Sequence, residues 1–99
     1  MKLRILSSAI QDLTDGFRFY EIQEEGLGSY FLESLFSDID SLKLYAGIHS
    51  KVFGYYRALS KRFPYAIYYT KEQSLISINA VLDCRRNPRW LHEKLKGLK

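Results

Sequence analysis

The apolar residues of this 99-residue chain change their spacing near its middle. Between residues 8 and 45 they recur every three or four positions, which is the spacing of a helix with one buried face. Between residues 55 and 83 they tend to alternate with polar residues, and aromatic and β-branched residues are frequent, as in strands. Helices followed by strands predict an α+β fold, with a helical hairpin packed on one face of a small, mainly antiparallel sheet.

Two helices are expected in the first half of the chain, after a short strand at residues 2–6. Ser8 is expected to cap the first helix, with Gln11 three residues later as in a capping box. Gly26 and Gly28 permit a tight turn between the helices. The first helix is expected to bury Ile10, Leu13, Phe17 and Tyr20. The second is expected to bury Phe31, Leu35, Ile39 and Leu42, with Leu32 and Phe36 beside them.

Three strands and a final helix are expected in the second half. The strands are predicted at residues 55–60, 64–70 and 75–83, with a loop at 47–54 and a turn at 71–74. The last strand alternates, which should place one set of residues on a single face. That set is Ile76, Ile78, Ala80 and Leu82. Pro88 suits the first turn of a helix. The apolar side of that helix should contain Trp90, Leu91 and Leu95.

The composition indicates one globular domain over residues 1–99, because the 46% hydrophobic and 26% charged fractions are those of ordinary soluble proteins. The sequence has no apolar run near the roughly 18 residues of a membrane-spanning helix. Its basic and then apolar start is too short for a signal peptide. Cys84 is the single cysteine, so an internal disulfide and a cysteine-rich zinc site are excluded. We therefore expect a cytoplasmic protein.

Positive charge is concentrated in the second half of the chain. Residues 1–49 contain 4 Lys and Arg against 8 Asp and Glu, whereas residues 50–99 contain 11 against 3. A basic half of this kind favours a polyanionic partner or an acidic protein partner.

The motifs of common enzyme classes are missing. The sequence has no GxxxxGK[ST] loop, no GxGxxG and no HExxH. His49 and His92 are far apart and have no neighbouring cysteine or carboxylate cluster, so surface roles are expected, and neither a metal nor a cofactor is predicted. The serines with no recognisable base partner are Ser7, Ser8 and Ser60. The acidic residues expected to form a solvated helix face are Asp12, Asp15, Glu24 and Glu25.

Arginines mixed with tyrosines are the remaining candidates for function. The basic residues are Arg57, Lys61, Arg62, Arg85, Arg86 and Arg89, and the tyrosines are Tyr55, Tyr56, Tyr65, Tyr68 and Tyr69. Guanidinium groups bind phosphates through two hydrogen bonds, and aromatic rings stack on bases. Such a set could bind RNA, or promote its cleavage by neutralising charge on the phosphate. The alternative is that most of these tyrosines are half-buried sheet residues.

Four segments resemble the RelE/ParE superfamily of toxins from bacterial type II toxin–antitoxin systems, in its plasmid-stabilisation, ParE-like branch. They are SSAIQDL (7–13), FYEIQEEGLGSYFLESL (19–35), YYRALSKRFPYAIYY (55–69) and AVLDCRRNPRW (80–90). The resemblance implies the sheet and helical hairpin already predicted. It also implies a cognate antitoxin whose extended C-terminal part wraps the toxin.

The resemblance also indicates which residues bind the target or the antitoxin. Arg57, Arg85 and Arg86 match recurrent basic positions of the family most closely. The full set expected at this surface is Arg57, Arg62, Arg85, Arg86, Arg89 and Trp90. Asp83 stands where many relatives have a histidine, so an acid–base role of that histidine is missing here.

Two targets are implied by the family, and they decide whether the chain is an enzyme. ParE-like members inhibit DNA gyrase and need no catalytic site, whereas RelE-like members cut messenger RNA on the ribosome. The long hairpin and the lack of an acid–base set favour gyrase. A third possibility is an inactive homologue that acts only as a binding partner.

Arg85 and Arg86 should have different roles, because neighbouring side chains on an extended segment point to opposite sides. Arg86 is expected to brace the fold by pairing with Asp83. Arg85 is expected to be free and functional.

Overall fold

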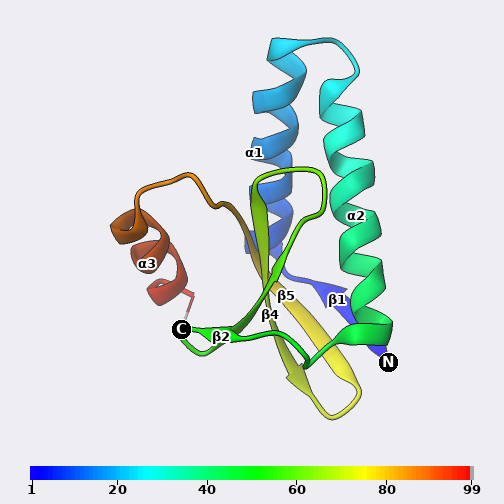
Figure 1. Cartoon of the computed structure of the whole chain (residues 1–99), viewed down its shortest axis with the longest axis vertical. Coiled ribbons are helices and arrows are strands. Elements are labelled where there is room, and N and C mark those ends of the chain that lie inside the picture. Colours follow the sequence, from blue (N-terminus) through cyan, green and yellow to red (C-terminus); the bar gives the residue numbers. More distant parts are fainter. Residues whose placement is uncertain (99) are drawn as a thin grey trace.

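The computed structural model describes residues 1–98 as three helices and one five-stranded sheet (Figure 1). The elements are β1 (Lys2–Ile5), α1 (Ser7–Gln23), α2 (Leu27–Tyr45), β2 (Lys51–Val52), β3 (Tyr55–Leu59), β4 (Tyr65–Glu72), β5 (Leu75–Asp83) and α3 (Pro88–Lys96). The α+β prediction is confirmed, with boundaries that differ by a few residues from those expected.

The strands lie in the order β1-β5-β4-β3-β2. β1 runs parallel to β5, and the other neighbours are antiparallel. The predicted loop at 47–54 contains β2, which pairs Val52 with Tyr55 across a turn at Phe53 and Gly54. Gly54 has a φ of 88°, which glycine adopts without strain. The predicted turn at 71–74 shortens because β4 continues to Glu72.

Helices cover both faces of the sheet (Figure 1). The hairpin of α1 and α2 packs on one face, where Phe31, Leu35 and Ile39 join the core. The opposite face is covered by α3, whose Leu95 is fully buried against Tyr68. The predicted apolar side of α3 is confirmed, because Trp90 and Leu91 pack on the same cluster.

A register shift in β5 changes which residues face each layer. Tyr68 pairs with Ala80 but Tyr69 pairs with Ile78, so Asn79 has no partner opposite it. An extra residue in a strand reverses the alternation beyond it. Ile76, Ile78 and Val81 therefore face the hairpin, and Ala80 and Leu82 face α3. The prediction of one shared face for Ile76, Ile78, Ala80 and Leu82 is wrong.

The start and buried face of α1 also differ from the prediction. The helix begins at Ser7, and Ser8 does not cap it but donates its hydroxyl proton to the carbonyl of Asn79 at 2.7 Å. Its buried residues are Ala9, Leu13, Gly16 and Tyr20, whereas Ile10 is 53% exposed.

Two glycines explain how closely α1 and α2 approach. A Cβ at Gly16 would lie 2.5 Å from the ring of Phe31, and one at Gly28 would lie 2.6 Å from the carbonyl oxygen of Phe17. The turn between the helices is held by Glu21, whose carboxylate accepts the N–H groups of Gly26 and Gly28. Gly16 and Gly28 thus permit the close helix spacing, and hydrogen bonds from Gly26 and Gly28 hold the turn.

Leu35→Ala should lower the free energy of unfolding by ~2–5 kcal/mol, because Leu35 is 0% exposed between the hairpin and the sheet. Leu44→Ala is the matched control on the same helix, since Leu44 is 80% exposed, and it should change stability little. Urea denaturation of both variants checks this. Equal effects would mean that the wrong face of α2 has been assigned to the core.

Candidate binding cleft

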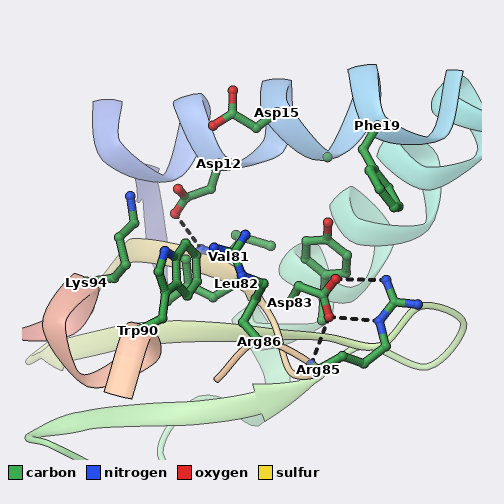
Figure 2. Close-up of a pocket in the computed structure, with 12 residues that line it drawn as sticks. Asp12, Asp15, Phe19, Val81, Leu82, Asp83, Arg85, Arg86, Trp90 and Lys94 are labelled. Carbon is green, nitrogen blue, oxygen red and sulfur yellow. Dashed lines mark hydrogen bonds and ion pairs between the residues drawn. The ribbon is translucent and has the colours of Figure 1, made fainter. Parts of the chain in front are cut away.

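A cleft of about 490 Å³ lies between α1 and the segment that joins β5 to α3 (Figure 2). Asp12, Asp15 and Phe19 come from α1, and the opposite side is formed by the end of β5 and by α3. The remaining lining residues are Gly16, Tyr65, Val81, Leu82, Asp83, Arg85, Arg86, Trp90 and Lys94. The cleft thus combines acidic, basic and aromatic side chains.

Asp83 and Arg85 form an ion pair at one end of the cleft. One carboxylate oxygen accepts the backbone N–H of Arg85 at 2.8 Å and its Nε–H at 3.0 Å, and the other accepts from the guanidinium at 2.8 Å. These hydrogen bonds hold the pKa of Asp83 below its usual value. The expected roles of the two arginines are therefore reversed, and Arg85 is the brace.

The exchange of roles between Arg85 and Arg86 follows from the path of the backbone after β5. The N–H of Arg86 bonds to the carbonyl of Asp83, so the chain turns directly after the strand. Strand alternation does not apply within a turn, and the Asp83 side chain folds back over the residue two positions ahead, as in an Asx-type turn.

Arg86 stacks on Trp90, with its guanidinium carbon 3.8 Å from the ring centroid. Lys94 approaches the same ring, with Nζ 5.5 Å from the centroid. The local sequence makes this arrangement possible, because Asn87 caps α3 through the N–H of Arg89, and Trp90 and Lys94 are one helical turn apart. Within residues 1–98, neither Arg86 nor Lys94 forms an ion pair or a side-chain hydrogen bond.

Asp12 is part of this cleft rather than of a solvated face, which corrects the sequence prediction. β1 ends at Ile5, so the edge of β5 beyond Ile78 is open to α1. There Asp12 accepts the N–H of Val81 at 3.0 Å, one turn after Ser8 bonds to Asn79. Burial raises the pKa of Asp12 to about 6, although the Val81 N–H and the charge of Lys94 act in the opposite direction.

The tyrosines expected among the basic residues serve the core. Tyr55, Tyr65, Tyr68 and Tyr69 are buried, and Tyr56 is half-buried and stacked on Tyr69. Burial raises the pKa of Tyr65 to about 12, so its hydroxyl keeps its proton at neutral pH. These rings are not available as a stacking platform for bases, and the alternative reading of half-buried or buried sheet residues is correct.

The predicted basic surface is divided between several places. Arg85, Arg86 and Trp90 meet in the cleft. Arg57 does not join them and contacts Cys84, with its guanidinium nitrogen 3.9 Å from the sulfur. Arg62 and Arg89 are exposed, on the β3–β4 connection and on α3.

Asp12 and Lys94 were missed as members of the cleft. The signal for Asp12 is its position four residues after Ser8, which places both polar side chains on one helix face. The sequence alone does not reveal that this face meets a strand edge.

The two histidines lie outside the cleft. Nδ1 of His49 is hydrogen-bonded to the hydroxyl of Tyr69, and His92 stacks on Phe53 with ring centroids 4.2 Å apart. Across residues 1–98, no cluster of three or more His, Cys, Asp or Glu residues is placed to hold a metal ion. No helix in the same range is both long and apolar enough to span a membrane.

No protein-family model and no curated protein matches the sequence. Among solved structures, a chain of the "Chromosomal ParDE TA system from P. aeruginosa" has a similar fold, with a TM-score of 0.68 and 19% sequence identity. The similarity covers 82% of this chain and 92% of that chain. The two chains therefore share their fold.

Asp12→Asn should stabilise the protein at neutral pH by roughly 1 kcal/mol, allowing for solvent screening of a carboxylate that is not fully buried. The folded-state pKa of about 6 lies above the usual 3.8, so folding favours the protonated form. The stabilising contribution is complete below pH 3.8 and is lost as the pH rises to about 6. Asparagine is neutral and can still accept the Val81 N–H. Urea denaturation should give a difference at pH 7.5 that disappears near pH 3.5, and a pH-independent difference would contradict the burial argument.

Asp83 and Arg85 should show a coupling of about 0.5–1 kcal/mol in a double-mutant cycle of Asp83→Asn and Arg85→Gln at pH 7. The lowered pKa of Asp83 means that this contribution is present above pH 3.8 and is lost as the pH falls below it. Arg89→Gln is the control, because its side chain is exposed. A coupling near zero would remove the brace role from Arg85.

Proposed function

We propose that this chain is the toxin of a bacterial type II toxin–antitoxin pair of the RelE/ParE superfamily, neutralised by a cognate antitoxin. The observation that carries the proposal is the fold shared with a chain of the ParDE system of P. aeruginosa. The four sequence segments that resemble the superfamily fall in α1, the helical hairpin, β3 with β4, and the end of β5 with the start of α3. Fold and sequence thus favour the same family.

Inhibition of DNA gyrase is the proposed action, because Asp83, Arg85 and Tyr65 of the cleft are poorly suited to act as an acid or a base. Arg85 is neutralised by Asp83, and Tyr65 keeps its proton at neutral pH. His49 and His92 are engaged elsewhere in the fold. A toxin that acts by occupying its target needs no acid or base.

Cleavage of messenger RNA on the ribosome is the second candidate, and one observation favours it. Asp12, with a pKa of about 6, lines the same cleft as the free guanidinium of Arg86. A carboxyl group in this pKa range suits proton transfer near neutral pH, and a guanidinium can neutralise a phosphate in the transition state. An inactive homologue, acting only as a binding partner, is the remaining alternative.

The proposed target- or antitoxin-binding residues are Arg57, Arg62, Arg85, Arg86, Arg89 and Trp90. The strongly basic second half of the chain favours an acidic antitoxin. The association of this chain with the antitoxin should weaken as the salt concentration is raised, because exposed charges are screened. The cytoplasm, where gyrase and ribosomes are found, is the proposed location.

Induction of the chain alone in bacteria should arrest growth, and co-expression of the proposed cognate antitoxin should restore growth. Plasmid supercoiling and messenger RNA integrity are measured in the same cultures. Loss of negative supercoiling with intact messenger RNA is expected from gyrase inhibition. Rapid RNA cleavage would favour the second candidate.

The variant Asp12→Asn separates the two actions further. A gyrase inhibitor should keep most of its toxicity with this variant, whereas an endonuclease that uses Asp12 should lose it. Normal growth on induction of folded wild-type protein would support the inactive homologue and contradict a toxin.

A further inference from the structure

The cleft between α1 and α3 contains two cationic side chains that form no ion pair among residues 1–98. Arg86 and Lys94 both approach the ring of Trp90, at 3.8 and 5.5 Å from its centroid. Stacking holds the guanidinium plane but leaves its N–H donors unused, since no acceptor contacts them within residues 1–98. A guanidinium held in this way is prepared to bind an oxyanion through two hydrogen bonds, because its orientation is already set.

The opposite wall of the same cleft is acidic. Figure 2 shows Asp12 and Phe19 projecting from α1 toward the strand ends, with Asp15 one turn after Asp12. One oxygen of Asp12 accepts the Val81 N–H, and the other has no hydrogen-bond donor among residues 1–98. Phe19 and Leu82 add apolar surface beside these charges. A ligand thus meets Arg86 on the β5–α3 connection and Lys94 on α3, with the carboxylates of α1 opposite them.

We infer that this cleft binds a segment of a protein partner that carries a carboxylate for Arg86 and Lys94 and, close in its sequence, a basic side chain for Asp12. The inference rests on the proposed function, since the partner it describes is the antitoxin. It adds the chemistry of the bound segment: opposite charges separated by apolar residues that contact Trp90 and Phe19.

A nucleic acid fits this cleft less well than a peptide. Each nucleotide carries a phosphate charge, so a strand that placed one phosphate on Arg86 would bring further negative charge toward Asp12 and Asp15. The buried tyrosines offer no rings for base stacking. A peptide with one carboxylate and one basic group satisfies both walls.

Arg85 belongs to the proposed binding surface, but its guanidinium is not one of the two cations that bind the partner's carboxylate. Its guanidinium is already neutralised by two hydrogen bonds from its side chain to Asp83. Binding a ligand carboxylate there would require the ion pair to open. Of the two arginines that line the cleft, Arg86 is the one whose side-chain donors have no acceptor among residues 1–98.

Trp90 is the single tryptophan of the chain, so its fluorescence reports on this cleft alone. The probes are capped tetrapeptides with one Lys and one Glu separated by two Leu residues, in both orders, and the same peptides with Gln in place of Glu. A single-stranded RNA octamer and a DNA octamer of mixed sequence test the nucleic-acid alternative. At least one mixed-charge peptide should bind saturably, and its Gln form should bind about tenfold more weakly.

Matched variants assign the contacts. Arg86→Gln should weaken the mixed-charge peptide about tenfold, whereas Arg18→Gln, which removes an exposed arginine on α1, should leave binding unchanged. Lys94→Gln should weaken binding and Lys96→Gln, two residues later on α3, should not. Circular dichroism confirms that each variant is folded.

The outcomes decide between the proposals. Equal binding of the Glu and Gln peptides, tighter binding of either octamer, or no fluorescence change with any peptide at millimolar concentration would overturn the inference. The measurement uses neither the antitoxin nor growth arrest. Peptide binding by a chain that does not arrest growth would support the inferred peptide site and contradict the toxin function. Growth arrest by a chain that binds none of the peptides would support the toxin function and overturn the inferred site.

Discussion

The irregularity at Asn79 in β5 is the constraint on which the two-sided core depends. β5 is the strand that pairs with both β1 and β4, and its side chains pack against α1 and α2 on one face and α3 on the other. The extra residue turns Val81 toward the hairpin and Ala80 and Leu82 toward α3. The shift thus decides which apolar side chains of this nine-residue strand enter each layer.

The same region of β5 links the fold to the cleft. β1 stops before β5 does, and α1 completes the hydrogen bonding of the exposed edge through Ser8 and Asp12. Unpaired backbone groups in a partly buried position would be costly, so these two polar side chains stabilise the junction. The contact with β5 buries part of Asp12, which raises its pKa and leaves a poorly solvated carboxylate in the cleft. Structural and binding roles therefore meet at one residue.

The basic charge of the second half does not form one continuous site. Arg85 stabilises the turn after β5, Arg57 contacts Cys84, and Arg86 remains available beside Trp90. A high count of arginines is thus a poor guide to a binding surface until the partner of each is known. In this chain the cations of the cleft that are available for binding are Arg86 and Lys94, which face the carboxylates of α1.

Local patterns in the sequence determined the type and order of the elements. The hydrophobic spacing predicted the hairpin, the buried residues Phe31, Leu35 and Ile39 of α2, and the apolar side of α3, because these depend on residues close together in the chain. The two-residue strand β2 was missed, because so short a segment has no period of its own and is defined by its pairing with β3.

Tertiary structure alone decided the faces of β5, the buried face of α1 and the membership of the cleft. The reversal at Asn79 arises from the pairing of β5 with β4. The environment of Asp12 arises from contact with Val81, 69 residues further along the chain. The roles of Arg85 and Arg86 were exchanged because a turn replaced the assumed extended backbone. Periodicity describes which residues share a face of one element, but only packing determines what that face meets.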